Sequence, residues 1–265
     1  MKKILILLLF YSTFANAQGA YALYDYERRE YQVNSNVNEV RSIASITKLF
    51  TAITIMRSGE DLDEKVKVTG RSGGHFPKGM MVSRKDLMTA MLISSDNLAA
   101  ETLANTYPGG FNQYIIDVND WVKGFGLINT QIVDASGLLP GNQSTAAELI
   151  VVLQKASEIA IIRDVAADRT AVINIPKGKK TLRINLHNTN PSLFAFDNIL
   201  LSKTGFTNAA GRCVVMLVEK NKHQYGVIIL GQRNVQARSK LATELITKPP
   251  LPVVEPEPIE FTFQL

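Results

Sequence analysis

The sequence predicts an α+β fold, in which an antiparallel β-sheet is flanked by helices and accompanied by a largely helical subregion. Extended patterns occur near both ends, at 21–33 and at 171–230, whereas 42–156 carries mainly helical patterns. The regular alternation of strands and helices that a doubly wound parallel sheet requires is absent. We therefore expect one mixed domain, in which the first strand joins the late hairpins in an antiparallel sheet.

The first 17 residues are predicted to be a secretory signal peptide rather than part of this domain. Lys2 and Lys3 precede the apolar run 4–10, and Ala15-Asn16-Ala17 supplies small residues for cleavage. The apolar run is too short to span a bilayer. We expect the mature chain to start at Gln18, to form one domain over 18–247 and to end in a separate tail over 248–265.

Composition limits the remaining possibilities. The chain has 265 residues, of which 46% are hydrophobic, enough for one sizeable core. Cys213 is the only cysteine, so neither a lipid anchor after the signal nor an intrachain disulfide is expected, and Cys213 itself is predicted to be a buried small hydrophobe. Without Lys2 and Lys3 the formal charge falls from +5 to +3. This mild charge does not indicate nucleic-acid binding.

The N-terminal elements can be placed in order. Aromatic and β-branched residues over 21–33 flank the charged turn 27–30, which predicts two strands. The stretch 42–56 predicts a core helix that ends near Ser58-Gly59. Glycine and proline residues break 62–82 into loops and short strands.

Two capping signals divide the middle of the chain. Ser83-Arg84-Lys85-Asp86 resembles a capping box and predicts a helix through Leu92, and Thr145-Ala146-Ala147-Glu148 predicts another toward Ala156. Further predicted elements are a break at 94–97, a helix at 98–106, a turn at 107–110, a helix at 111–125 that contains Trp121, and a glycine-bearing loop at 134–142.

The C-terminal part is predicted to contain two hairpins and one helix. The strands 171–175 and 181–186 flank the basic turn 176–180, which is expected to be a solvated tip. A second hairpin joins 214–218 to 225–230, and a helix is expected over about 235–246. Five prolines after residue 248 and a final alternation of apolar and polar residues predict an extended tail, either disordered or presenting a short strand to a protein partner.

Ser45 and Lys48 are the first candidates for chemistry. Their spacing of three residues places both side chains on one face of a helix, where the amine can reach the hydroxyl. A serine hydroxyl needs an adjacent base to become a nucleophile, and a buried lysine with a lowered pKa can be that base. Ser-x-x-Lys is common by chance, so this pair needs further support.

Two more motifs supply that support. Ser95-Asp96-Asn97 lies at a break between helical segments, and Lys203-Thr204-Gly205 opens the second hairpin region. Ser-x-x-Lys, Ser-x-Asn and Lys-Thr-Gly occur in this order in penicillin-binding proteins and class A β-lactamases. Together the three motifs are specific, although each alone is not.

With these motifs, the chain resembles the low-molecular-mass penicillin-binding proteins, which are serine D-alanyl-D-alanine peptidases of peptidoglycan metabolism. The resemblance covers about 21–246 and includes Ser42 to Leu49, Asp134-Ala-Ser-Gly-Leu and Lys203 to Cys213. The last segment looks most like the D-alanyl-D-alanine endopeptidase branch, which trims cross-links. This family implies a β-lactamase/DD-peptidase-like fold, a periplasmic location without a membrane anchor, peptidoglycan stem peptides as substrates, β-lactams as covalent inhibitors, and no cofactor.

The resemblance also implies a role for each motif residue. Ser45 would attack a D-alanyl carbonyl group, Lys48 would be the neutral general base and Ser95 would pass a proton to the leaving amine. Asn97 would hold the substrate backbone, and Lys203, charged, would bind a carboxylate together with Thr204. The remaining implied contacts are Gly205 beside the substrate, the amides of Ser45 and Phe206 as oxyanion hole, and Arg238, with Arg233, near the substrate carboxylate.

Other functions would make different demands on these residues. A carboxypeptidase would use the same residues on a terminal D-alanine. A class A β-lactamase would need a glutamate near the site, but Glu101, Glu148 and Glu158 all lie in helical patterns. A catalytically idle binding module would not need an intact Ser45 and Lys48. His75, His187 and His223 show no metal-ligand spacing, so no metal and no metallopeptidase activity is expected.

Overall fold

A computed structural model describes residues 19–248. Its central feature is a five-stranded antiparallel sheet in the order β2-β1-β11-β10-β9. The five strands are β1 (Ala20–Asp25), β2 (Glu30–Ser35), β9 (Ile199–Thr207), β10 (Gly211–Lys220) and β11 (His223–Gln232). Because β1 pairs with β11, the predicted pairing of the first strand with the second late hairpin is confirmed. The prediction is wrong for the first late hairpin, because residues 170–187 form a separate two-stranded sheet. The predicted signal peptide and almost all of the predicted tail lie outside the described residues.

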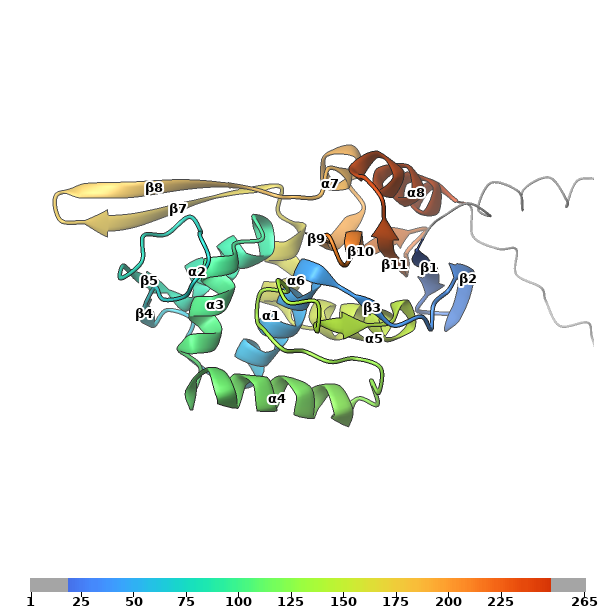
Figure 1. The fold of residues 1–265 in the computed structure, drawn as a ribbon. Helices are drawn as coiled ribbons and strands as arrows, with labels where there is room; N and C mark the ends of the chain where they lie inside the picture. Colours follow the sequence, from blue (N-terminus) through green and yellow to red (C-terminus); the bar gives the residue numbers. More distant parts are fainter. Residues whose placement is uncertain (1–18, 249–265) are drawn as a thin grey trace, which may run out of the picture.

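Both faces of the sheet are buried, and the sequence alternation of β1 shows how. Ala20 and Ala22 belong to the larger of two hydrophobic clusters, whereas Tyr21 and Leu23 belong to the second. Successive side chains of a strand point to opposite faces, so each strand contributes to two cores. The helix α8 (Val235–Thr247) covers one face through residues such as Leu241 and Leu245. Most other helices lie on the opposite side (Figure 1).

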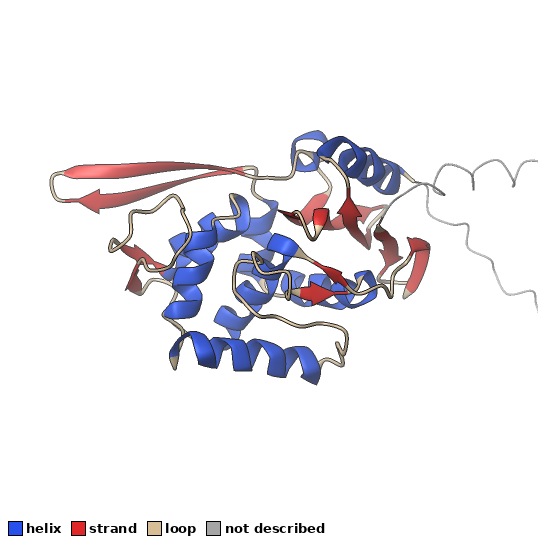
Figure 2. Cartoon of the chain, in the orientation of Figure 1, coloured by secondary structure: helices blue, strands red, loops and turns tan. Residues whose placement is uncertain are grey.

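The helical region forms the second part of the fold (Figure 2). Its helices are α1 (Thr47–Arg57), α2 (Arg84–Ile93), α3 (Asn97–Asn105), α4 (Gly110–Gly124), α5 (Ala146–Ser157) and α6 (Ala160–Ala167), and a short α7 (Ser192–Ala195) follows later. Both predicted capping signals are confirmed. Ser83 Oγ accepts a hydrogen bond from Asp86 N at 3.0 Å, and Thr145 Oγ1 accepts one from Glu148 N at 3.1 Å. Within residues 19–248, no helix combines the length and apolar character that a bilayer span would need.

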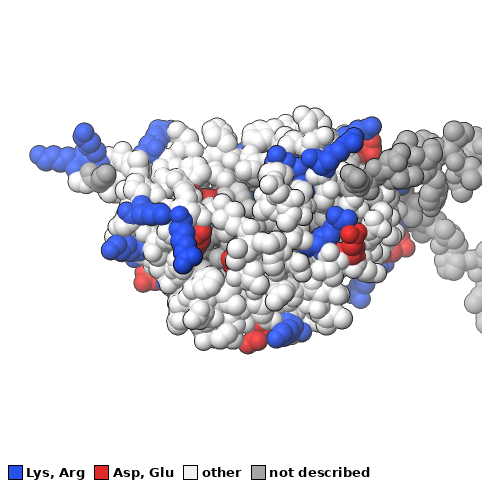
Figure 3. All heavy atoms as spheres, in the orientation of Figure 1, with Lys and Arg blue, Asp and Glu red and all other residues white. Residues whose placement is uncertain are grey.

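Three two-stranded sheets complete the structure. They are β3 (Arg41–Ser42) with β6 (Gln143–Ser144), β4 (Lys65–Lys67) with β5 (Met81–Ser83), and β7 (Thr170–Lys177) with β8 (Lys180–His187). The last pair forms a long hairpin that extends away from the sheet and alongside α2 (Figure 1). Lys179 and Lys180 are exposed at its tip, as predicted, and basic side chains are visible at this end of the molecule (Figure 3).

Candidate active site

Ser45 and Lys48 meet where a short 3₁₀ helix, η1 (Ala44–Ile46), leads into α1. The prediction that both residues share one continuous α-helix is wrong in this detail, because α1 begins only at Thr47. Ala44 adopts a positive φ of 47°, so the backbone reaches Ser45 in a non-helical conformation. The tighter turn still places Lys48 Nζ 2.9 Å from Ser45 Oγ. The contact that the motif spacing predicted is therefore present.

Lys48 is buried from solvent and surrounded by oxygen atoms. Its Nζ lies 2.7 Å from Asn97 Oδ1 and 2.5 Å from the carbonyl oxygen of Ser136. Burial lowers the pKa of Lys48 to about 7, against the opposing effect of nearby carboxylates, chiefly Asp134. A neutral amine has two N–H donors for the two acceptors and a lone pair for the Ser45 proton. The three contacts therefore match the geometry of a general base.

Asn97 is positioned by the start of α3. Asp96 is the N-cap residue, and its Oδ1 accepts a hydrogen bond from Ala99 N at 2.8 Å. Its Oδ2 accepts one from His75 N at 2.6 Å and lies 2.7 Å from His75 Nδ1. Ser95 has a φ of 58°, which produces the sharp break between α2 and α3. Ser95 itself is half-buried.

The loop that follows Asp134 contributes a residue to which the sequence gave no role. The Ser136 carbonyl accepts the hydrogen bond from Lys48, and Ser45 Oγ lies 3.4 Å from the same oxygen. Asp134 holds this loop, because its carboxylate accepts hydrogen bonds from the backbone amides of Ser136, Gly137 and Leu139 at 2.5–2.7 Å. The residues Asp134-Ala-Ser-Gly can be read in the sequence. The contact of the Ser136 carbonyl could not be predicted from them, because every residue has a backbone carbonyl group.

Two glycines enclose the peptide group before Ser45. A Cβ atom at Gly137, which has a φ of 82°, would lie 2.0 Å from the Ala44 oxygen, and one at Gly205 would lie 2.9 Å from Ser45 N. Real Cβ atoms do not approach backbone atoms so closely, so both positions require glycine. The loop after Asp134 and strand β9 thus fix the orientation of the Ser45 amide from two sides.

We expect Gly137→Ala to reduce the rate of penicillin acylation by about 100-fold, because the added methyl group displaces the Ser45 backbone by a fraction of an ångström or more. The rate of labelling by a fluorescent penicillin measures this effect. Gly124→Ala is the matched control, since a Cβ atom there meets no neighbour within 4 Å. Equal acylation rates for the two variants would show that the enclosure of Ser45 is unimportant.

Strand β9 brings the third motif to the same site. Lys203 is 1% exposed, and its Nζ donates a hydrogen bond to the carbonyl oxygen of Thr204 at 3.1 Å. Burial, followed by the charges of Lys48 and Arg238, lowers the pKa of Lys203 well below its usual value. No carboxylate lies within ion-pair distance of Lys203 in the described part of the chain. The cluster therefore has unbalanced positive character, which an anionic ligand would relieve.

The other candidate residues separate into buried and exposed groups. Thr204 is buried, and its Oγ1 lies 2.5 Å from Thr189 Oγ1. Phe206 is 46% exposed, and the Arg212 guanidinium lies 3.5 Å from its ring centroid. Arg238 is 5% exposed, with Nη1 3.5 Å from the Cys213 carbonyl oxygen. The sequence could not distinguish the two arginines of the last helix region.

The structure distinguishes Arg238 from Arg233. Arg238 is buried and its charge reaches Lys203, whereas Arg233 is exposed to solvent. Cys213 is buried as predicted, and burial raises the pKa of its thiol to about 11. A thiol with a raised pKa is a poor nucleophile at neutral pH. Ser45 is thus the better candidate nucleophile.

A comparison with family models identifies the class of protein. Residues 13–234 match the model of the S11 peptidases, described as D-alanyl-D-alanine carboxypeptidase. The chain belongs to this family. It is a serine-type D-Ala-D-Ala peptidase, and the fold and family that the sequence motifs predicted are confirmed.

Curated relatives and solved structures agree with this assignment. The D-alanyl-D-alanine endopeptidase of Escherichia coli K12 is 33% identical over 81% of this chain and 71% of its own length. The D-alanyl-D-alanine endopeptidase of Pseudomonas aeruginosa is 32% identical with the same coverage. Among solved structures, Streptomyces K15 DD-transpeptidase matches 87% of this chain and 95% of its own with a TM-score of 0.81 at 23% identity, which supports the fold. Penicillin-binding protein D2 of Listeria monocytogenes, solved in a cefotaxime-bound form, matches 86% of this chain and 95% of its own with a TM-score of 0.74 at 25% identity.

Proposed function

We propose that this peptidase cleaves D-alanyl cross-links in peptidoglycan through an acyl-enzyme at Ser45. The observation that carries the proposal is the contact of Ser45 Oγ with the buried amine of Lys48 at 2.9 Å. Lys48 accepts the Ser45 proton while Oγ attacks the D-alanyl carbonyl carbon, forming a tetrahedral intermediate. The amides of Ser45 and Phe206 stabilise its oxyanion. Collapse breaks the peptide bond, and water then hydrolyses the ester.

Ser95 and Asn97 complete the reacting centre in this proposal. Ser95 carries a proton toward the leaving amine, and this half-buried residue lies two positions before Asn97, which contacts Lys48. Asn97 uses its oxygen to hold Lys48 at 2.7 Å. Its amide NH₂ group is then the part that faces a substrate carbonyl, because one end of the side chain is already engaged. Gly205 leaves space for the substrate against the edge of β9.

The basic residues Lys203 and Arg238 favour a substrate that carries a carboxylate group. Lys203 and Thr204 bind this carboxylate, and the buried guanidinium of Arg238 supplies a second charge. A bound carboxylate raises the pKa of Lys203, so this lysine is charged in the complex while Lys48 stays neutral. Arg233 is exposed to solvent, so the buried Arg238 is the stronger candidate for this role.

The endopeptidase assignment rests on the relatives. Both of those described above are named D-alanyl-D-alanine endopeptidase, and they share 33% and 32% identity with this chain. A relative named D-alanyl-D-alanine carboxypeptidase, from Salmonella typhimurium, is 24% identical over 86% of this chain and 61% of its own length. The sequence of the segment 203–213, which resembles the endopeptidase branch, also supports endopeptidase activity. Covalent inhibition by β-lactams and a periplasmic location belong to the same proposal.

A class A β-lactamase mechanism finds no support among the three candidate glutamates. Glu101 accepts hydrogen bonds from the amides of Arg71 and Ser72 at 2.5 and 3.0 Å. Glu148 accepts from Asn129 and Thr130, and Glu158 pairs with Lys155. Each carboxylate is engaged with its own surroundings, and none of the three hydrogen-bonds to Ser45 or Lys48 among the described residues.

Digestion of isolated sacculi tests the proposed substrate. We expect the purified protein to convert cross-linked muropeptide dimers to monomers, as measured by mass spectrometry, because the endopeptidase relatives share its family and the site can hold a D-alanyl carbonyl group. Ser45→Ala is the inactive control. Release of free D-alanine from pentapeptide monomers with the dimers intact would instead assign carboxypeptidase activity.

A further inference from the structure

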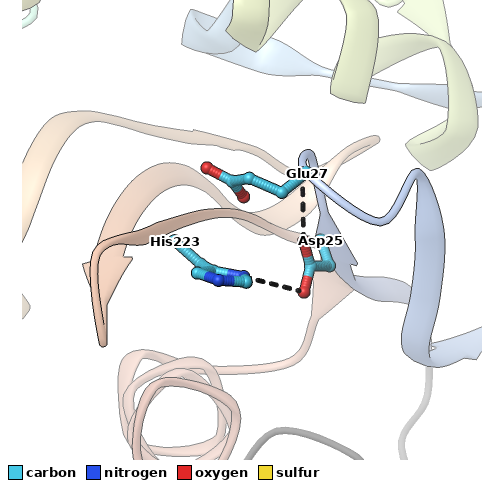
Figure 4. A group of neighbouring side chains, drawn as sticks. All are labelled: Asp25, Glu27 and His223. Atoms are coloured by element: carbon cyan, nitrogen blue, oxygen red, sulfur yellow. Dashed lines mark hydrogen bonds and ion pairs between the residues drawn. The ribbon is translucent and has the colours of Figure 1, made fainter. Parts of the chain in front are cut away.

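A second group of titratable side chains lies where β1 ends and β11 begins, at the opposite end of the sheet from the catalytic site. Asp25 is the last residue of β1, Glu27 follows in the turn, and His223 is the first residue of β11 (Figure 4). One ligand atom from each of the three lies within 4.8 Å of the other two. We propose that this group is a binding site for one divalent transition-metal ion of the zinc type.

The buried carboxylate of Asp25 is the observation that points to a ligand. Its side chain is fully buried, and its Oδ2 has no hydrogen-bond partner among the described residues. Burying a carboxylate oxygen without a hydrogen bond is costly, so such an atom favours a cation at closer range than Arg28 Nε, at 3.9 Å, and His223 Nδ1, at 3.8 Å. The other oxygen, Oδ1, accepts hydrogen bonds from Glu27 N and Arg28 N, both at 3.0 Å. These two bonds orient Oδ2 toward His223 in the manner of a metal ligand held by outer contacts.

The separation between Asp25 and His223 fits a shared ion better than a direct hydrogen bond. Asp25 Oδ2 lies 3.8 Å from His223 Nδ1, which is beyond hydrogen-bond distance. Two ligands at about 2.0 Å from a tetrahedral zinc ion are about 3.3 Å apart. A shift of half an ångström by the His223 side chain, which is 40% exposed, would therefore satisfy both bonds. The Tyr225 ring stacks on the imidazole, at 6.5 Å between centroids and 20°, and limits its rotation.

Glu27 supplies the third ligand from the solvent side. Both of its carboxylate oxygens lie 3.0 Å from Gln224 N, so the group is already held beside His223. One oxygen can keep this hydrogen bond while the other binds the ion. One imidazole nitrogen and two carboxylate oxygens, with a fourth position open to water, form a donor set that zinc accepts. The imidazole makes calcium or magnesium a poorer occupant.

Arg28 carries a positive charge close to Asp25, and this charge opposes the binding of a metal cation. Its Nε lies 3.9 Å from Asp25 Oδ2, but its Nη1 also lies 3.8 Å from Glu30 Oε1. The guanidinium can remain with Glu30 when the ion takes Oδ2. We therefore expect Arg28→Gln to tighten metal binding, which an ordinary ion-pair cluster would not predict.

The position of the site indicates a structural rather than a catalytic role. The catalytic end of the sheet can be located on β11 through the strand pairing. Gly205 of the catalytic site pairs with Cys213 of β10, and the next residue, Val214, pairs with Ile229 of β11. His223 precedes Ile229 by six residues, which is about 20 Å along the strand. An ion at this place would clamp the β1–β2 turn to the start of β11. It should raise the stability of the fold and leave the chemistry at Ser45 unchanged.

Calorimetric titration of the purified, chelator-treated protein with zinc chloride tests the site. We expect one zinc ion per chain and a higher melting temperature with zinc than without it, whereas millimolar magnesium or calcium should cause no such shift. His223→Gln and Asp25→Asn should each weaken zinc binding by at least about tenfold. His187→Gln, which alters an exposed histidine elsewhere, is the matched control and should bind zinc like the wild type.

Two results would overturn the inference. One is the absence of saturable zinc binding by the wild-type protein. The other is zinc binding that His223→Gln leaves unchanged, which would place the ion elsewhere, for example at the His75–Asp96 pair. Penicillin acylation, measured without metal in each variant, keeps this outcome separate from the fate of the proposed catalytic function.

Discussion

Replacement of Ser45 by alanine should abolish covalent labelling by penicillin and reduce peptidase turnover by about 10⁴-fold or more, because the attacking oxygen is removed. The folded structure should be almost unaffected. Ser45 is half-buried, and its hydroxyl contributes contacts to Lys48 and to the Ser136 carbonyl but little to the hydrophobic core. We therefore expect a melting temperature within about 2 °C of the wild-type value.

The measurement combines gel-based labelling by a fluorescent penicillin with peptide mapping of the adduct. Ser42→Ala is a useful control, because Ser42 is in the same segment and its hydroxyl donates a hydrogen bond to the Pro140 carbonyl at 2.7 Å, away from Lys48. It should retain labelling. An adduct mapped to Ser95, or labelling that survives in Ser45→Ala, would show that Ser45 is not the nucleophile.

Replacement of Lys48 by arginine should reduce the acylation rate by about 10³-fold or more, because a guanidinium keeps its proton at neutral pH and cannot act as a base. Lys155→Arg is the matched control, since Lys155 is a surface lysine paired with Glu158. Near wild-type acylation by Lys48→Arg would exclude the general-base role.

The pH dependence of the wild-type enzyme gives an independent check. Burial lowers the pKa of Lys48 to about 7, so the amine is protonated below this pH and free to accept a proton above it. The acylation rate should therefore fall about tenfold for each pH unit below 6 and level off above pH 8. A rate that rises as the pH is lowered through 7 would require a different base.

The sequence identified the family and the main chemical groups without help from the structure. Ser-x-x-Lys, Ser-x-Asn and Lys-Thr-Gly are short, ordered motifs. The first two lie at boundaries of elements that local patterns could locate, whereas Lys-Thr-Gly lies inside β9, a strand that the sequence did not predict. The capping residues Ser83 and Thr145 were predicted correctly for the same reason, since a side chain that binds an amide three residues later leaves a local signature. The predicted continuous helix through Ser45 failed because the positive φ of Ala44 arises where Gly137 and Gly205 crowd the backbone.

Some features depend on residues that are far apart in the chain. The hydrogen bond from Lys48 to the Ser136 carbonyl joins a side chain to a backbone atom 88 positions away, and backbone atoms leave no mark on residue type. The three histidines show no short metal-binding spacing, but His223 lies beside Asp25 and Glu27, which are far away in the sequence, because β11 pairs with β1.

The sequence by itself determined the α+β class and the family, and it predicted the nucleophile and its partner lysine, because those depend on local spacing and on periodic burial. Only the tertiary structure decided how deeply Lys48 and Lys203 are buried, that Arg238 rather than Arg233 joins them, and that one carboxylate oxygen of Asp25 is left without a hydrogen bond. The physical reason is that desolvation, and the pKa shifts that follow from it, arise from every element packed around a group. A residue's own neighbours in sequence supply only part of that environment.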